Sequence, residues 1–479
     1  MKKIKLLGIA FVAFSISACN PDSYEHEHTF SDEWRYDKVY HWHSSTCGHA
    51  VVSDQAEHVL SEEWEIETNE TETSKGLKFR KCTTCDYRIQ ESIPSKLKFT
   101  LNEDKQSYCV SANSKYIKGA ITIPSSFKGL PITKIERYGF EGCNDITSIV
   151  IPDSVTIIDD DAFALCKSIT SINIPHSVTY IGAEAFRRLG ALKTIEIPDS
   201  VTSIGERCFA SFHSLESVKL PNGLSAIPSD AFNYCTSLKS IDFPDSVTEL
   251  GDFSFSHCNS LTSVKLEKNI ETIGICAFQS CENLFSITFG SSVKTIGISA
   301  FENCDKLTSV NIPDNITSIG EEAFCGCDGL VSVSIGSGIT SIESQTFWVC
   351  KSLKNLTIGN NVTSIGERAF VGCDSLESLV IPDSVTKLGL YCFANSKGLK
   401  TLTIGDGLEV IDNEAFGSCK ALTNITFGKN VKEINDSAFY DCTSLETLQL
   451  PTSLRSIGSS AFSGCKSLKN VTIPSNSII

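Results

Sequence analysis

After its first twenty residues the sequence has no apolar run of the roughly 20 residues that a membrane-spanning helix needs, so no transmembrane helix is expected. Positive charge is also scarce, because 41 Lys and Arg stand against 57 Asp and Glu and give a formal net charge of -16. Such a surface repels phosphate backbones. Nucleic acid is therefore not an expected partner.

Recognisable catalytic motifs are absent as well. The sequence contains no His-Glu-x-x-His, phosphate-cradling glycine loop, nucleophile elbow or evident pair of catalytic carboxylates. His176, His213 and His257 are isolated from other chemistry-bearing residues. We therefore expect a protein that is not an enzyme, with no catalytic residues. A metal-dependent enzyme centred on residues 26–94 is the weakest alternative.

Residues 1–18 have the basic, apolar and small-residue regions of an export signal peptide. The run Ile16-Ser17-Ala18-Cys19 resembles the bacterial lipobox, and this resemblance implies cleavage before Cys19 and lipidation of its sulfur. Residues 19–25 would then be a lipid anchor and tether, because attached acyl chains hold proteins on membranes. The expected location is the bacterial envelope, at the outer membrane or cell surface. An ordinary cleaved signal with a chance cysteine is the alternative.

The rest of the chain is dominated by a repeat of 23 residues. Phenylalanine recurs fifteen times at this spacing, at Phe140, Phe163, Phe186, Phe209, Phe232, Phe255, Phe278, Phe301, Phe324, Phe347, Phe370, Phe393, Phe416, Phe439 and Phe462. A constant period of this length is the signature of a solenoid, in which each unit buries its apolar face against its neighbours.

The unit from Phe301 to Ala323 shows the positions that most units share, which are Cys304, Leu307, Val310, Ile312, Pro313, Ile316, Ile319 and Gly320. Alternation of polar and apolar residues from Ser309 to Ile312 predicts one short strand per unit, with the strands stacked in parallel. Ile316 and Ile319 suit a tight return passage, as either a second short strand or a 3₁₀ turn. Little helix is expected.

The unit resembles the BspA-like class of bacterial leucine-rich repeat proteins, which reads Leu-x-x-Ile-x-Ile-Pro, then Val-x-x-Ile-Gly, then Ala-Phe and a following Cys. The resemblance covers Ile121 to Ile473 and implies a right-handed leucine-rich-repeat solenoid over residues 121–479, with a cap over residues 97–120. Some units depart from the pattern. Leu189, Phe212 and Ser396 replace the cysteine, and Glu267 replaces the proline.

Twelve of the 21 cysteines share one position of the repeat. They are Cys143, Cys166, Cys235, Cys258, Cys281, Cys304, Cys327, Cys350, Cys373, Cys419, Cys442 and Cys465. Stacked positions have Cα atoms about 5 Å apart, which allows disulfides, but parallel side chains disfavour them. Because Leu189 and Phe212 occupy the same position, we favour a column of buried thiols that pack as small apolar groups.

Residues 26–94 form a separate module that is rich in histidine and cysteine. A Cys-x-x-Cys pair can supply two of the four ligands of a tetrahedral zinc site, and so small a β module needs such a staple. We expect a structural zinc with the ligands Cys47, His49, Cys82 and Cys85. A second ligand set is His28, His41, His43 and His58. The alternatives are a disulfide or histidines that are merely solvated.

The predicted strands carry outward polar residues in two rows. One row is nearly all Ser, Thr or Asn and includes Ser309, Asn355, Thr401 and Asn424; the other varies and includes Asn173, Glu196, Lys219, Asp242, Lys265 and Asn311. Variation on a constant frame is typical of a binding face, although a solvated sheet surface would also explain each residue singly.

These patterns predict a cell-surface lipoprotein that binds a macromolecular ligand, most simply a protein, through its repeat face. The resemblance suggests adhesion to host molecules or neighbouring cells, which is an argument by analogy from the fold. The main alternative is a scaffold or envelope-assembly protein that faces the periplasm. The strand of the last repeat, Val471 to Ile473, also offers an edge for self-association.

Overall fold

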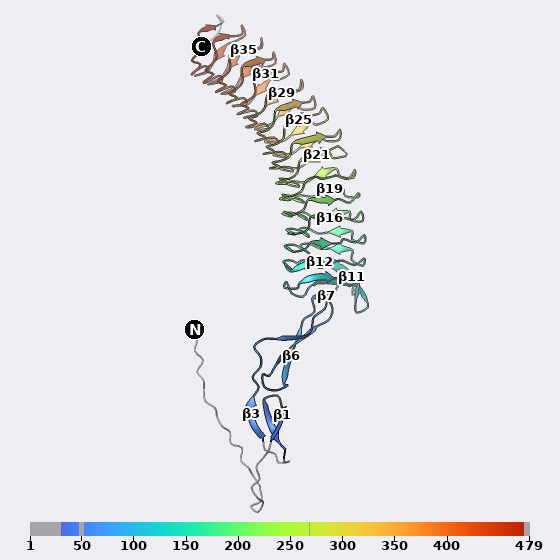
Figure 1. The fold of residues 1–479 in the computed structure, drawn as a ribbon. Coiled ribbons are helices and arrows are strands. Elements are labelled where there is room, and N and C mark those ends of the chain that lie inside the picture. Colours follow the sequence, from blue (N-terminus) through green and yellow to red (C-terminus); the bar gives the residue numbers. More distant parts are fainter. Residues whose placement is uncertain (1–29, 47–51, 268, 474–479) are drawn as a thin grey trace, which may run out of the picture. The chain divides into compact units, whose positions relative to one another are not determined.

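The computed structural model describes residues 30–46, 52–267 and 269–473. All regular elements in these residues are β-strands, so the described chain has no helix, and none that could cross a membrane. The chain divides into two compact units, residues 1–71 with 75–94 and residues 72–74 with 95–479. Figure 1 shows the strands of both units.

The N-terminal unit contains two antiparallel sheets of three strands each. The first sheet consists of β1 (Phe30–Tyr36), β2 (Tyr40–Ser45) and β3 (Val52–Glu57), and the second of β4 (Glu65–Thr68), β5 (Gly76–Lys81) and β6 (Arg88–Ile93). The predicted small β module is therefore present.

The second unit is a parallel β-solenoid of about 16 turns. Its coils stack one on the next from β7 to the last labelled strands (Figure 1), and most coils contribute two short strands. The first strand of each coil is the one predicted from the Leu-x-x-Val-x-Ile pattern. These strands are β9 (Gly119–Thr122), β12 (Ile146–Val150), β14 (Ser171–Ile172), β16 (Thr194–Glu196), β18 (Ser217–Lys219), β21 (Ser263–Leu266), β23 (Ser286–Phe289), β25 (Ser309–Ile312), β27 (Ser332–Ile335), β29 (Asn355–Thr357), β31 (Ser378–Ile381), β33 (Thr401–Ile404), β35 (Asn424–Thr426), β37 (Thr447–Gln449) and β39 (Asn470–Thr472).

The return passage of each coil is a second strand, which decides between the two forms that the sequence allowed. These strands are β8 (Tyr108–Ala112), β11 (Leu130–Ile135), β13 (Ile157–Ile158), β15 (Tyr180–Ile181), β17 (Ser203–Ile204), β19 (Ala226–Ile227), β20 (Glu249–Leu250), β22 (Thr272–Ile273), β24 (Thr295–Ile296), β26 (Ser318–Ile319), β28 (Ser341–Ile342), β30 (Ser364–Ile365), β32 (Lys387–Leu388), β34 (Val410–Ile411), β36 (Glu433–Ile434) and β38 (Ser456–Ile457). Strand β7 (Leu97–Leu101) pairs antiparallel with β8 at the start of the solenoid, and β10 (Ser126–Phe127) forms a hairpin with β11.

Strands pair in register with the equivalent residues of the next coil. Ser309 of β25 pairs with Ser332 of β27, which in turn pairs with Asn355 of β29. Each step equals the 23-residue period, so equivalent side chains form straight columns along the stack. This register confirms the predicted parallel stacking.

Phenylalanine forms the central column of the core. From Phe140 to Phe462 each ring stacks on the next, with centroids 5.0 to 5.7 Å apart. The rings from Phe140 to Phe439 are fully buried, and most of the Leu, Val and Ile side chains in the columns beside them are buried as well. A single coil could not enclose these side chains, so burial depends on the neighbouring coils.

The repeat cysteines form a second column, in which all twelve are free thiols and all but the half-buried Cys465 are buried. They pack within the apolar core, and most of the thiols also donate a hydrogen bond to the carbonyl oxygen of the phenylalanine 26 residues earlier. In the coil where Ser396 replaces the cysteine, its hydroxyl donates to the Phe370 carbonyl oxygen at 3.3 Å. The position therefore holds a small hydrogen-bond donor in most coils and a buried apolar side chain at Leu189 and Phe212, and the predicted thiol column is confirmed.

Candidate functional sites: the strand face and a His/Cys cluster

The first strands of the coils present the predicted outward rows to solvent. The ten residues singled out from the sequence are all exposed; they are Asn173, Glu196, Lys219, Asp242, Lys265, Ser309, Asn311, Asn355, Thr401 and Asn424. We call this surface the strand face. The position of these residues agrees with the sequence pattern, whereas their role in binding stays a prediction.

Asn173 differs from the others because its side-chain amide is hydrogen-bonded to the backbone of the preceding coil. Its Oδ1 accepts a hydrogen bond from the Ile151 N–H at 2.9 Å, and its Nδ2 donates to the Ile151 carbonyl oxygen at 3.0 Å. These side-chain hydrogen bonds extend the link between the two coils beyond the last backbone pairing of β12 with β14. Asn173 is thus a less suitable contact for a partner than the pattern suggested.

Some charges on the strand face and beside it pair with charges one coil away. Lys219 forms an ion pair with Glu196, and Glu216 lies between Lys193 and Lys239 at 3.0 and 2.5 Å. Hydrogen bonds from Lys239 and Lys193 lower the pKa of Glu216 to about 2. Such exposed pairs contribute little to stability singly, but they neutralise the surface locally.

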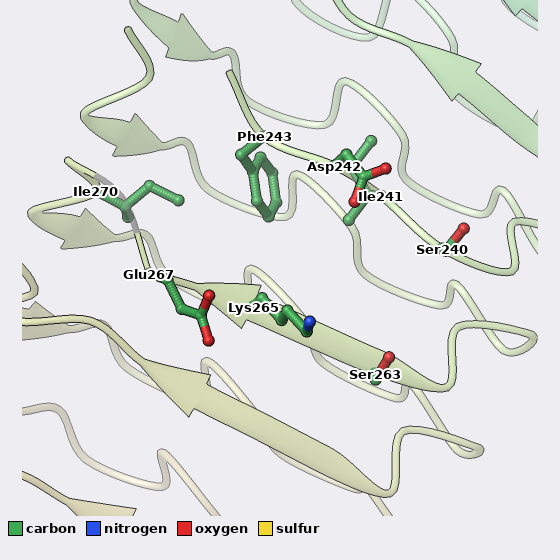
Figure 2. A pocket seen from close by; sticks show the side chains of 8 residues that line it. All are labelled: Ser240, Ile241, Asp242, Phe243, Ser263, Lys265, Glu267 and Ile270. Atoms are coloured by element: carbon green, nitrogen blue, oxygen red, sulfur yellow. The ribbon is translucent and has the colours of Figure 1, made fainter. Parts of the chain in front are cut away.

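The strand face is interrupted in the coil that contains residues 240–243. No strand is assigned there, so β18 ends one sheet and β21 begins the next. A hollow of about 250 Å³ lies at this break (Figure 2). It is lined by Ser240, Ile241, Asp242, Phe243, Ser263, Lys265, Glu267 and Ile270.

The hollow combines an apolar floor with charged walls. Phe243 and Ile270 are buried, whereas Asp242, Lys265 and Glu267 are exposed and stand around the opening (Figure 2). Within the described part of the chain none of these three charged groups forms an ion pair, in contrast to Glu196 and Lys219. Their hydrogen-bonding capacity therefore remains available to a partner.

A second hollow of about 260 Å³ adjoins the first. Asp242 and Phe243 line both hollows, and Lys219 and Asn222 line the second on its far side. Three of the residues predicted from the sequence therefore line a continuous depression: Lys219, Asp242 and Lys265. Glu267 and Phe243 were missed as site residues. The replacement of the repeat proline by Glu267 was the signal that could have marked the place.

The N-terminal unit contains a separate cluster of potential metal ligands. The ligand atoms of His41, His58, Cys82 and Cys85 all lie within 4.8 Å of one another. His41 Nδ1 is 3.8 Å from Cys82 Sγ, and His58 Nδ1 is 3.4 Å from Cys85 Sγ. His41 is on β2, His58 follows β3, and the two cysteines lie in the turn between β5 and β6.

The surroundings of this cluster shift the pKa values of two of its members, Cys82 and His58. Burial opposes ionisation of Cys82, but hydrogen bonds from the Thr84 backbone N–H and from His58 outweigh it and lower the pKa of Cys82 to about 6. Burial likewise opposes protonation of His58, but its hydrogen bonds with Cys82 and with the Asp37 carbonyl oxygen raise its pKa. Thiolates are the form in which cysteine binds metals.

The described residues bring together members of both predicted sets of metal ligands. Cys82 and Cys85 are brought together as expected, but their described neighbours are His41 and His58, which the sequence placed in a second set. Cys47, His49 and His28 lie outside the described residues. The ring of His43 packs against Trp34, at a centroid distance of 3.9 Å, and is not part of the cluster.

The fold and the strand face define a bacterial leucine-rich-repeat solenoid. Residues 133–262, 204–332, 248–377 and 363–479 match the family described as BspA type Leucine rich repeat region (6 copies). The matches together span more than half of the chain, and the chain belongs to this family. The family indicates a role in protein–protein interaction or at a surface, and its solenoid is typically a binding scaffold without enzymatic activity.

Several solved structures of bacterial proteins are similar to this chain. A leucine-rich repeat protein from Bacteroides ovatus is 22% identical, with a TM-score of 0.52 over 80% of this chain and 88% of that one. A leucine rich cell surface protein from Faecalibacterium prausnitzii is 24% identical, with a TM-score of 0.39 over 79% and 93%. The pneumococcal vaccine antigen PcpA is 17% identical, with a TM-score of 0.45 over 79% and 98%. No curated protein matches the chain.

Proposed function

We propose that this protein is a lipid-anchored envelope protein that binds a protein ligand through the strand face, with the hollows around Asp242 as the centre of the contact. The observation that carries the proposal is the unpaired charge at the break in the sheet. Asp242, Lys265 and Glu267 surround an apolar floor, whereas equivalent charges in neighbouring coils neutralise one another.

A protein ligand fits this site better than a small molecule. Each hollow, at about 250 or 260 Å³, is below the roughly 300 to 1,000 Å³ of typical small-molecule sites. A depression of this size suits a side chain inserted by a partner, while the rows of Ser, Thr and Asn beyond it offer hydrogen bonds over many coils. Apolar anchors within a polar surround are typical of protein interfaces.

A photo-crosslinking experiment on intact cells tests the position of the site. A photoreactive amino acid at Lys265 should yield a discrete crosslinked product. The same amino acid at Glu321, an exposed residue after β26 that lies outside the hollows, should not. Asp242→Lys should weaken the product at Lys265 about tenfold or more, because it reverses the charge that the partner would meet in the proposed complex, and like charges brought together at an interface are costly. Equal products at both positions, or none at Lys265, would refute the site.

The membrane anchor is a separate part of the proposal. Cys19 lies outside the described residues, and its lipidation rests on the run Ile16-Ser17-Ala18-Cys19. The variant Cys19→Ala should leave the detergent phase and appear in the aqueous phase on phase separation, with Cys47→Ala as the matched control. A variant that still partitions like the wild type would rule out the anchor and leave the ligand site unaffected.

A further inference from the structure

The N-terminal unit has very little apolar core. Among its described residues between 30 and 94, Phe79 and Cys82 are the only buried apolar side chains, at 8% and 6% exposure. Apart from the buried His41 and Gly76, the other residues of the strands in both sheets are half-buried or exposed. A unit of this size cannot balance its conformational entropy with so little burial, and small domains of this kind use disulfides or metal ions instead.

The four residues of the His/Cys cluster come in pairs from the two sheets. His41 and His58 belong to the β1–β2–β3 sheet and its end, and Cys82 and Cys85 belong to the turn that joins β5 to β6. We propose that this cluster is a structural zinc site in which His41, His58, Cys82 and Cys85 are the four ligands. A zinc ion there would join the two sheets at the place where the unit lacks a core.

The distances suit a tetrahedral ion. Ligand bonds of about 2.0 to 2.3 Å place neighbouring ligand atoms about 3.3 to 3.8 Å apart. The two N–S separations in the cluster are 3.4 and 3.8 Å, and no pair exceeds 4.8 Å. The ligand atoms need to move by about 1 Å at most, and both cysteines are free.

The groups around the ligands orient them for this role. His58 donates from Nε2 to the Asp37 carbonyl oxygen at 2.9 Å, which leaves Nδ1 to face the cysteines, and its ring stacks on Tyr87. The Tyr87 N–H donates to Cys85 Sγ at 3.5 Å. A backbone carbonyl bound to the outer nitrogen of a histidine, and an N–H directed at a sulfur, both hold metal ligands in place.

The donor set favours zinc over other metals and a structural role over a catalytic one. Two thiolates and two imidazoles in a tetrahedral arrangement are typical of zinc, whereas calcium and magnesium require oxygen ligands. The protein would supply all four ligands, so no position remains for a catalytic water. Residues 26–94 would thus contain a zinc staple and not a metalloenzyme.

Metal analysis of the purified full-length protein tests the ligand set. The wild type should contain about one zinc per chain. His58→Ala and Cys82→Ser should lose it, while His58→Cys should keep it because a third thiolate can replace the imidazole. The controls Cys47→Ser, His49→Ala and His43→Ala should keep full zinc content. Cobalt(II) substitution should give the visible bands of a tetrahedral site in the wild type and in His58→Cys.

Three outcomes would overturn the proposal. Zinc loss in Cys47→Ser or His49→Ala, with retention in His41→Ala and His58→Ala, would establish the other ligand set. A metal-free wild type with two fewer titratable thiols than its sequence contains would establish a disulfide instead. A metal-free wild type with all thiols free would mean that neither zinc nor a disulfide cross-links the two sheets. If zinc is structural, a chelator should make residues 30–93 sensitive to protease and leave the solenoid resistant.

Discussion

The thiol of Cys304 donates a hydrogen bond to the carbonyl oxygen of Phe278 in the preceding coil, at 3.3 Å. The same bond recurs from Cys281 to Phe255 at 3.2 Å and from Cys327 to Phe301 at 3.2 Å. Each thiol therefore links two coils through the backbone of the earlier one. A carbonyl oxygen has two lone pairs, and the thiol supplies a hydrogen-bond donor for the second lone pair of each buried phenylalanine carbonyl. This donor stabilises the fold, because leaving a buried polar group without a hydrogen bond is costly.

This arrangement predicts that the thiol column is reduced and unreactive in the native protein. Burial raises the pKa of Cys235 and of Cys281 to about 12, so thiolate is scarce at neutral pH. Iodoacetamide at pH 8 should label none of the eleven buried thiols from Cys143 to Cys442 in the folded protein, and all twelve thiols of the column after denaturation without a reductant; Cys465, in the last coil, is half-buried and is the one expected to react in the folded protein. Mass spectrometry of the peptides reports both states. Unlabelled cysteines in the denatured protein would mean disulfides and would contradict the account.

Val349 has an unfavourable backbone conformation, with φ of 58°. The equivalent residues in the coils on either side are Gly326 and Gly372, with φ of 68° and 74°. β-branched residues are rare in this left-handed region, whereas asparagine tolerates it, as Asn303 does at the same position. Val349→Asn should therefore stabilise the solenoid by about 1 kcal/mol.

Denaturant unfolding measures this change. The matched control is Val371→Asn, because Val371 is also half-buried but has an ordinary φ. That variant should show no gain. Equal effects of the two substitutions would mean that hydration of the side chain, and not backbone strain, governs stability at Val349.

The ion pairs of Glu216 predict a pH-dependent contribution to stability. Because Lys239 and Lys193 hold its folded pKa at about 2, below the ordinary value of 4.5, the contribution is present above about pH 4.5 and is lost as the pH falls toward 2. The difference in Tm between the wild type and Glu216→Gln should shrink over this range. Salt at 1 M should also reduce it at pH 7, since both partners are exposed.

Glu446→Gln is the control for this measurement. Glu446 has the same repeat position as Glu216, and it has no ion pair within the described chain. Its Tm difference from the wild type should be small and should not depend on pH between 5 and 2. A pH dependence as large as that of Glu216→Gln would contradict the assignment to the lysine pairs.

The fold could be predicted from the sequence because one physical rule repeats in every coil. A phenylalanine every 23 residues, with Leu, Val and Ile at fixed offsets, allows only one way to bury all of these side chains, which is to stack the coils in register. The return strand was ambiguous, since two residues such as Ser318 and Ile319 are too short to show a periodicity.

The candidate sites were harder to predict, because both depend on departures from local pattern. The hollow at Asp242 forms where residues 240–243 fail to pair as a strand, although their sequence differs little from that of neighbouring coils. In the N-terminal unit, His41 and His58 meet Cys82 and Cys85 where an isolated β-bridge joins Leu60 to Cys82 between the two sheets. The sequence showed which residue types gather there, but spacing alone could not assign partners.

The most direct test of the account is protease treatment of intact cells, with immunodetection of residues 97–479 and an internal lipoprotein as control. A surface protein that offers its strand face to protein ligands should lose the solenoid while the internal control survives. If the solenoid resists digestion until the envelope is opened, the surface role is wrong, and the partners of the strand face must be sought within the envelope.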